Sequence, residues 1–306
     1  GRNKQMPVSI ETMQRRMASY RDEIEDEVIG PAKDELQRIF REAEVELAKQ
    51  AKAFNMLIVD RSTGKLSSAV ENIEKATVLL DEVDAAIRRV IVDPGHVWAD
   101  QAGELAHAAG RELARVNFNV SQVSPELVRA AFENVTITEG ALRVGYEDMY
   151  RIINTVGSDV GTWFRRTTLD AVLEGLPVVN KMGGDSLMSR LVESGRLKPI
   201  TIRTESGKLI RRSVSQRAEA IARIEMGRIV NRTHEELARE VLGDAAVYRN
   251  SNPRDSRTTD ICMRASRQSA MTLQEWSDSE FGRPPRLRPF HLCRSVLIGG
   301  EAEWFQ

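Results

Sequence analysis

Apolar residues recur at three- and four-residue steps along the first two hundred residues, the spacing that puts them on one face of an α-helix. The first stripe begins near Pro31, and Asp34 and Arg38 lie four residues apart on its polar side. Its members are Leu36, Ile39, Phe40, Ala43, Leu47, Ala51 and Phe54. We therefore predict a long helix that begins near Pro31 and buries this face against another helix.

Further amphipathic stretches follow, separated by residues that break helices. The second stripe is Val70, Ile73, Thr77, Leu80, Val83, Ile87 and Val90, and the third is Trp98, Ala102, Leu105, Ala109, Leu113 and Val116. A turn is predicted at 60–64, and Pro94-Gly95 is expected to separate the two helices, because proline lacks the N–H that a helix interior requires. Ser124 before Pro125 has the pattern of an N-cap followed by proline at the first helical position. The region 1–197 is thus predicted to be a helical bundle or arm.

The period of the pattern changes to two after Lys198. Ile200 and Ile202 alternate with polar residues, and the glycine at Gly207 supplies a turn. This alternation around a turn is typical of two antiparallel strands. We predict a β-hairpin over 198–213.

Helices return after the hairpin. One is expected from Val214, and a second after Thr233, whose Thr-x-x-Glu pattern with Glu236 is that of a capping box. A final strand is expected at 296–298. The predicted fold class is mainly α, with an extended helical N-terminal region, 1–197, and a small C-terminal α+β module, 198–306.

Composition agrees with a helical chain that can form a core. Of the 306 residues 41% are apolar and 29% charged, and the apolar residues are chiefly Leu, Ile, Val and Ala, while aromatics make up 5%. No apolar run approaches the roughly 20 residues that span a bilayer. The N-terminal residues contain no hydrophobic signal core, and two cysteines suit a reducing cytoplasm. We expect no membrane contact.

The net charge of −1 gives no general reason to expect nucleic-acid binding, but charge is unevenly distributed. Between Arg21 and Glu46 there are ten acidic residues against four basic ones. Between Arg196 and Arg217 there are seven basic residues against one acidic. The basic stretch could contact DNA phosphates or an acidic partner, and the residues proposed for this are Arg203, Lys208, Arg211 and Arg212. The alternative is a solvated hairpin, because no aromatics are interleaved to stack on bases.

Both cysteines lie in the last sixth of the chain, where two interpretations compete. Cys262, His291 and Cys293, with Asp255 or Asp260, offer the ligands that zinc prefers. Strong zinc signatures use two close pairs, and here the only close pair is His291-x-Cys293. In the other interpretation the cysteines are small buried residues of a little sheet and His291 is a hydrogen-bonding side chain. A disulfide, a reactive thiol and a Cys262/His291 nucleophile and base stay open as well.

The polar residues of this segment favour a structural role. Asp255 can accept backbone N–H groups at a turn, and Arg257 or Arg294 can donate a two-pronged hydrogen bond to a carboxylate. Glu225 is a candidate for that carboxylate. We predict a polar clamp that holds long loops together.

These residues also form a pattern that resembles a known family. Asp255-Ser-Arg257-Thr258, then Cys262, then Arg283-Pro-Pro and finally His291-Leu-Cys293-Arg294 is similar to the C-terminal signature of phage Mu F-like head-morphogenesis proteins. The family ends in His-x-x-Cys-Arg, one residue longer than here. Upstream, the Ile-Ala-Arg223-Ile-Glu225 segment resembles the Ile-Ala-Arg-Thr-Glu helix of the family, and Asp60 to Lys65 more weakly resembles an N-terminal element.

The resemblance implies a minor head protein of a tailed bacteriophage or prophage. Such a protein is non-enzymatic and acts in head assembly, DNA packaging or DNA ejection. It associates with the portal and with major capsid and scaffold proteins, in several copies in the virion, after assembly in the host bacterial cytoplasm. Viral DNA is an alternative partner. No cofactor is implied, and zinc at Cys262, His291 and Cys293 stays an alternative.

Motifs of the common enzyme classes are absent from the sequence. It contains no Walker loop, dinucleotide fingerprint, His-Glu-x-x-His or Gly-x-Ser-x-Gly. For His96, His107 and His234 we expect solvated or packing roles. Three alternatives to the head protein are kept: a DNA-binding protein that uses 196–217, a zinc or cysteine enzyme at Cys262 and His291, and a toxin-like effector.

Overall fold

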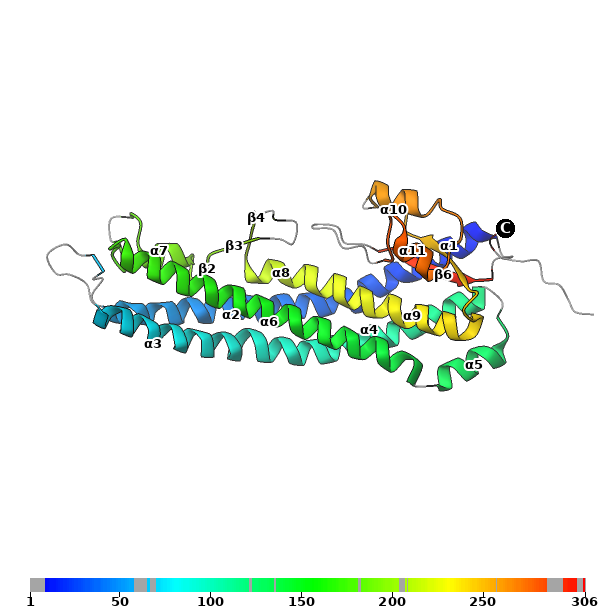
Figure 1. The fold of residues 1–306 in the computed structure, drawn as a ribbon, viewed down its shortest axis with the longest axis horizontal. Coiled ribbons are helices and arrows are strands. Elements are labelled where there is room, and N and C mark those ends of the chain that lie inside the picture. The colour runs from blue at the N-terminus through cyan, green and yellow to red at the C-terminus, as the bar shows by residue number, and fades with distance from the viewer. Residues whose placement is uncertain are drawn as a thin grey trace, which may run out of the picture. The chain divides into compact units, whose positions relative to one another are not determined.

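The computed structural model describes residues 9–57, 65–66, 70–120, 123–134, 136–180, 183–203, 207, 209–256, 258–284, 294–301 and 305. Over these residues the chain is mainly helical, with short strands paired in small two-stranded antiparallel sheets (Figure 1). The predicted fold class, mainly α with a small α+β C-terminal part, is confirmed.

The elements follow one another along the chain. The helices are α1 (Ile10–Ile24), α2 (Gly30–Ala51), α3 (Val70–Ile87), α4 (Asp93–Val120), α5 (Pro125–Glu133), α6 (Thr136–Leu173), α7 (Leu187–Leu191), α8 (Val214–Ile221), α9 (Gly227–Leu242), α10 (Asp260–Ala265) and α11 (Leu273–Asp278). Single π-helical turns are η1 (Glu25–Ile29), η3 (Arg88–Val92) and η4 (Ala222–Met226), and η2 (Lys52–Met56) is a 3₁₀ segment. The strands are β1 (Val192–Glu193), β2 (Arg196–Leu197), β3 (Ile200–Arg203), β4 (Leu209–Arg212), β5 (Val247–Ser251) and β6 (Val296–Gly300).

The helix predicted to begin near Pro31 in fact continues from α1 through η1 into α2. Proline in a helix interior removes a hydrogen bond and its ring clashes with the carbonyl four residues earlier. Here the π-helical turn η1 comes immediately before, and the N–H of Gly30 donates to the carbonyl of Glu25, five residues back. The extra residue in that turn accommodates the proline, so the helix does not break.

The break predicted at Pro94-Gly95 is wrong for the same reason. The π-helical turn η3 joins α3 to α4 without interruption, and the N–H of Asp93 donates to the carbonyl of Arg88. In both cases the proline is the second residue after the π-helical turn. A proline therefore marks a local widening of these helices, where the sequence pattern predicted an end.

The second helix start, predicted at Thr233, is also wrong. Helix α9 runs through this position, and Thr233 is buried. Gly110 of α4 approaches so closely that an added Cβ would lie 2.6 Å from the carbonyl oxygen of Val230 and 2.7 Å from Cβ of Thr233. Thr233 thus occupies a helix contact, a role that its capping pattern did not indicate.

Spacing placed some apolar side chains on the wrong face. Ile73 and Thr77 are exposed while Asn72 and Ala76 are buried, and Leu105 is 53% exposed. Neighbouring stripes of a helix share the same spacing, so periodicity alone does not select between them.

The start of α5 is confirmed, with Pro125 as its first residue after Ser124. The turn predicted at 60–64 lies outside the described residues.

By their contacts the residues form two compact units. The first consists of Gly1–Lys33, Ala99–Met149 and Ala220–Gln306, and the second of Asp34–Trp98 and Tyr150–Glu219. Each unit is therefore assembled from segments that are distant in sequence. The linear division into 1–197 and 198–306 stays a prediction.

The first unit has a hydrophobic core around β5 and β6. These strands pair antiparallel, with Tyr248 opposite Gly299, and all five residues of β6 are buried. Trp276 of α11 is buried beside them and its indole N–H donates to the carbonyl of Tyr248 at 2.7 Å. An added Cβ at Gly299 would lie 3.0 Å from Cβ of Ala238 in α9, so glycine permits the close approach of strand and helix.

The second unit contains the predicted hairpin. β3 and β4 pair antiparallel, with Ile200 opposite Arg212, which confirms the β-hairpin. The start of α8 is held by Glu44 of α2, which accepts the backbone N–H of Ser215 at 2.8 Å.

Through the described residues we find no helix with the length and apolar composition needed to cross a membrane.

Candidate functional site

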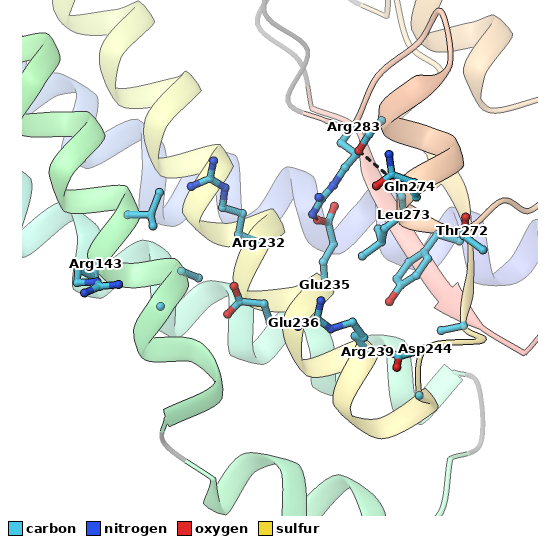
Figure 2. Close-up of a pocket in the computed structure, with 17 residues that line it drawn as sticks. Arg143, Arg232, Glu235, Glu236, Arg239, Asp244, Thr272, Leu273, Gln274 and Arg283 are labelled. Atoms are coloured by element: carbon cyan, nitrogen blue, oxygen red, sulfur yellow. Dashed lines mark hydrogen bonds and ion pairs between the residues drawn. The ribbon is translucent and has the colours of Figure 1, made fainter.

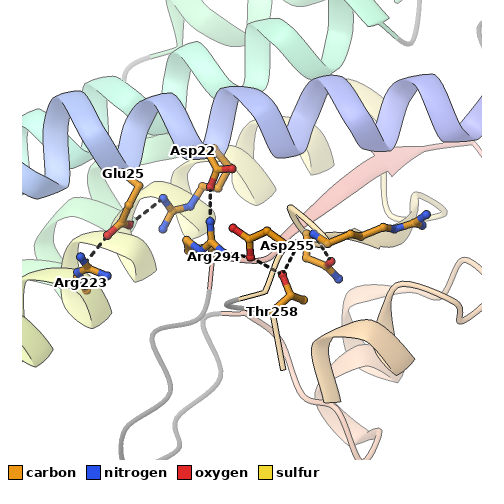
Figure 3. Close-up of polar contacts among 9 residues, drawn as sticks. Asp22, Glu25, Arg223, Asp255, Thr258 and Arg294 are labelled. Atoms are coloured by element: carbon orange, nitrogen blue, oxygen red, sulfur yellow. Dashed lines mark hydrogen bonds and ion pairs between the residues drawn. The ribbon is translucent and has the colours of Figure 1, made fainter. Parts of the chain in front are cut away.

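Arg294 connects two parts of the first unit that are far apart in sequence. It lies just before β6 with a side chain only 6% exposed, and one guanidinium nitrogen donates to Asp22 of α1 at 2.8 Å. The other donates to Asp255, in the turn before α10, at 2.5 Å. Figure 3 shows both carboxylates directed at this guanidinium. Burial alone would lower the pKa of Arg294, but its hydrogen bond to Asp255 and the charges of Asp22 and Asp255 together raise it.

The turn that carries Asp255 is held by its own side chains. The hydroxyl of Thr258 donates to the Asp255 carboxylate at 3.1 Å and accepts the backbone N–H of Asp255 at 3.2 Å. Arg254 has a φ of 54°, in the left-handed region that non-glycine residues rarely occupy. The carboxamide oxygen of Asn252 accepts the N–H of Arg254 at 3.1 Å and stabilises that conformation. The turn thereby presents the Asp255 carboxylate to Arg294.

A second group of charges joins two π-helical turns. Glu25 of η1 lies 3.2 Å from Arg223 of η4 and 3.4 Å from Arg21 of α1. The side chains of Arg21 and Glu25 are almost fully buried. A buried carboxylate is tolerable only when cations compensate for its lost hydration, and here two arginines do so. We call these two groups together the ion network: Asp22, Asp255, Thr258 and Arg294 form one group, and Arg21, Glu25 and Arg223 form the other.

Glu225 has a partner that the sequence analysis did not consider. Its carboxylate accepts two hydrogen bonds from Arg228, at 2.9 and 2.8 Å. Of its two candidate donors, Arg294 contacts Asp22 and Asp255. The other candidate donor, Arg257, lies outside the described residues.

Gln14 of α1 adds an uncharged connection to the same region. Its amide donates to the carbonyls of Asn250, at 2.9 Å, and Ser266, at 3.3 Å. The hydroxyl of Ser251 donates to the Gln14 carbonyl at 2.7 Å, and Arg254 donates to the Gln14 side-chain oxygen at 3.2 Å. Sequence reasoning missed Gln14, Asp22 and Glu25, because nothing near them in sequence indicates partners that lie 198 to 272 positions later in the chain.

Cys262 lies in α10 and packs in the hydrophobic core of the first unit, so its expected place in a small sheet is wrong. Asn252 donates to its backbone carbonyl at 2.8 Å. His291 and Cys293 lie outside the described residues. Within the described part of the chain no cluster of His, Cys, Asp and Glu could hold a metal ion, and the zinc hypothesis stays a prediction.

The basic stretch can be described only in part. Arg211 is exposed and donates to the carbonyl of Pro199 at 3.4 Å, and Arg212 is half-buried. The side chain of Arg203 and the whole of Lys208 lie outside the described residues. A DNA interface on this hairpin also stays a prediction.

A pocket of about 700 Å³ lies in the first unit, between the start of α6, one face of α9 and the segment that contains α11 (Figure 2). The charged side chains that line it are Arg143, Arg232, Arg239, Arg283, Glu235, Glu236 and Asp244. Burial raises the pKa of Glu235, and the nearby Arg283, which donates a hydrogen bond to it, opposes the shift. Burial likewise raises the pKa of Glu236. Sequence analysis considered Glu236 only as a capping residue and did not identify this pocket.

His234 precedes these acids on α9 but points into the protein. It is completely buried, and burial lowers its pKa to about 3. Its imidazole is therefore neutral at physiological pH, in agreement with a packing role.

Comparison of the chain with protein-family models, with curated proteins and with solved structures finds no match. The functional argument therefore rests on the residues and on their geometry.

Proposed function

We propose that this protein is a non-enzymatic minor head protein of a tailed phage or prophage, which associates with the portal or prohead and acts in head assembly, DNA packaging or ejection. One observation carries the proposal: four of the residues that form the Mu F-like pattern belong to the ion network. They are Arg223, Asp255, Thr258 and Arg294. These four residues of the pattern therefore make contacts that join distant segments of the first unit.

The ion network has the character of a structural device. Glu25, Arg21 and Arg294 are buried and engaged in ion pairs. A group that is neutralised by its neighbours and shielded from solvent is poorly placed to meet a substrate. This favours an assembly component over an enzyme.

The network also ties α1 to the C-terminal residues. Asp22 and Glu25 reach Arg294 and Arg223, which lie 272 and 198 positions later in the chain. A folded head protein needs its partner surfaces held in one arrangement, because an interface loses affinity when its parts must first be ordered. We propose that the ion network holds the partner surfaces of the first unit in one arrangement.

The test is assembly with phage head proteins from the same genome. The chain is co-expressed with portal, scaffold and major capsid proteins, the particles are separated by sedimentation, and the chain is detected by mass spectrometry. We expect it in particles that contain portal and not in particles assembled without portal. Arg294→Met should reduce incorporation, whereas Arg15→Gln, which removes an exposed arginine of α1, should not. A wild-type chain that stays at the top of the gradient while portal-containing particles form would refute the proposal.

A further inference from the structure

The hairpin of β3 and β4, in the second unit, has an edge that pairs with no other strand. In the described part of the chain its sheet contains these two strands alone (Figure 1). In an antiparallel pair, alternate residues of each strand direct their N–H and C=O groups away from the partner strand. Among the described residues no other segment forms backbone hydrogen bonds with Leu209, Ile210 or Arg211. The outer edge of β4 is therefore open to a further strand.

The two faces of the hairpin differ in exposure. Along β4, Leu209 and Arg211 are exposed, while Ile210 and Arg212 are half-buried. Ile200 of β3, opposite Arg212, is buried. Because successive side chains of a strand point to opposite faces, the face of Ile200 anchors the hairpin and the face of Leu209 and Arg211 lies in solvent. Leu209 is 60% exposed, so a strand added beside β4 could bury apolar surface there.

The edge of β4 is also basic. The stretch 196–217 contains seven basic residues against one acidic. Arg217 is compensated by Asp159 at 2.7 Å, but Arg196 and Arg211 form no ion pair with a carboxylate of the described residues. Arg211 donates to the carbonyl of Pro199, a neutral acceptor that leaves the charge of the guanidinium uncompensated. A partner of this edge should therefore carry negative charge.

These charges select among the occupants that an open edge can accept. A second copy of the chain that paired through β4 would place its own arginines beside Arg211 and Arg212, and like charges on adjacent strands are destabilising. DNA phosphates would attract the arginines but would leave Leu209 and the outer N–H and C=O groups of β4 unused. An acidic segment in an extended conformation would use the charge, the apolar side chain and the backbone groups together.

We propose that the edge of β4 binds an extended, acidic segment of a partner protein, which adds to the hairpin as a third strand. In this mode of recognition the backbone hydrogen bonds supply affinity, and the side chains of alternate residues supply specificity. On the exposed face, an apolar residue of the segment lies beside Leu209 and a carboxylate, two positions away, lies beside Arg211. An isolated two-stranded hairpin is only marginally stable in water, so the added strand also stabilises β3 and β4.

The test uses the full chain and the synthetic peptide acetyl-Glu-Thr-Val-Thr-Glu-Thr-Val-amide, which has glutamate and valine on one face when it is extended. In calorimetric titration we expect a Kd below about 1 mM, and at least about tenfold weaker binding when lysine replaces glutamate. Two N-methylated versions, each without the N–H groups of one set of alternate residues, separate strand pairing from charge attraction. The version methylated on the edge that faces β4 should bind about tenfold more weakly or worse, and the other within about threefold.

Protein variants and hydrogen exchange locate the site. Arg211→Glu should weaken binding of the acidic peptide about tenfold or more. Arg41→Glu makes the same change of charge at an exposed position of α2 in the same unit, and should keep the affinity within about twofold. Bound peptide should slow amide exchange in β4, because the outer N–H groups become hydrogen bonded. Unchanged melting temperatures show that both variants fold.

Three results with the peptides would overturn the proposal. They are no binding of the acidic peptide at about 1 mM, equal affinities of the two N-methylated versions, and unchanged exchange of β4 in the bound state. A DNA duplex of about 20 base pairs that binds more tightly than the acidic peptide at about 150 mM salt, and loses affinity in Arg211→Glu, would assign the hairpin to nucleic acid instead. None of these results bears on whether the chain joins phage particles, so this inference and the proposed function fail independently.

Discussion

Replacement of Arg294 by methionine is the most direct test of the ion network. The change keeps an unbranched side chain of similar length but removes the cation between Asp22 and Asp255. Breaking a buried ion pair costs about 3–5 kcal/mol. Asp22 and Asp255 are 36% and 35% exposed, so both carboxylates regain part of their hydration and the cost is smaller. We expect a loss of about 2 kcal/mol of unfolding free energy in the first unit.

Hydrogen exchange followed by mass spectrometry measures this loss unit by unit. A change of about 2 kcal/mol corresponds to about 30-fold faster exchange of the most protected amides. The acceleration should appear in peptides from α1, β5 and β6, while peptides from α3, in the second unit, should exchange at the wild-type rate.

A double-mutant cycle isolates the pair itself. Asp22→Asn alone should be milder than Arg294→Met, and the two changes together should show a coupling of about 1 kcal/mol, because they remove the same interaction. Arg15→Gln serves as the control on α1. If the Arg294→Met chain exchanges at wild-type rates in α1 and β6, the network does not hold these segments together.

Three further changes, and Gly140→Ala as a control for one of them, test the interior of the first unit. The pKa of His234 is about 3 in the folded chain and about 6.5 in the unfolded chain, so the unfolded chain binds the proton first as the pH falls. The free energy of unfolding therefore decreases below about pH 6.5. His234→Leu should remove about 2 kcal/mol of this decrease at about pH 5, measured by thermal melts. Glu235 should give the opposite pH dependence of stability, because its pKa is raised in the folded chain. The stability that it contributes at low pH is lost as the pH rises above 4.5, so Glu235→Gln should flatten this fall in melting temperature with pH. An unchanged slope of melting temperature against pH would contradict the raised pKa. Gly110→Ala should lower the free energy of unfolding in urea by about 1–3 kcal/mol, because the added Cβ would meet the carbonyl of Val230. Gly140→Ala has a helical backbone and open space around its Cβ, so it should raise the free energy of unfolding by up to about 1 kcal/mol. Equal effects of the two changes would refute the close helix contact at Gly110.

Periodicity predicted the elements better than it predicted their ends. The hairpin of β3 and β4, the strand β6 and the helix start at Pro125 were all indicated by local patterns. The continuous helices through Pro31 and Pro94 were not, because the π-helical turns that accommodate these prolines have no sequence signature of their own.

The residues of the candidate site were likewise predicted only in part. Arg223, Asp255, Thr258 and Arg294 were singled out from the sequence, and the structure places all four in the ion network. Their partners Asp22 and Glu25 were visible only as members of an acidic run, and the pocket beside α9 was not predicted at all.

The sequence by itself determined which segments are helical and which residues carry the charges, because helix and strand periods arise from contacts between near neighbours along the chain. Only the tertiary structure decided which charges meet. Arg294 pairs with Asp22 because α1 packs against β5 and β6, and that packing depends on the summed burial of many side chains. An ion pair across 272 residues is a consequence of the fold, so no local pattern around either residue could indicate it.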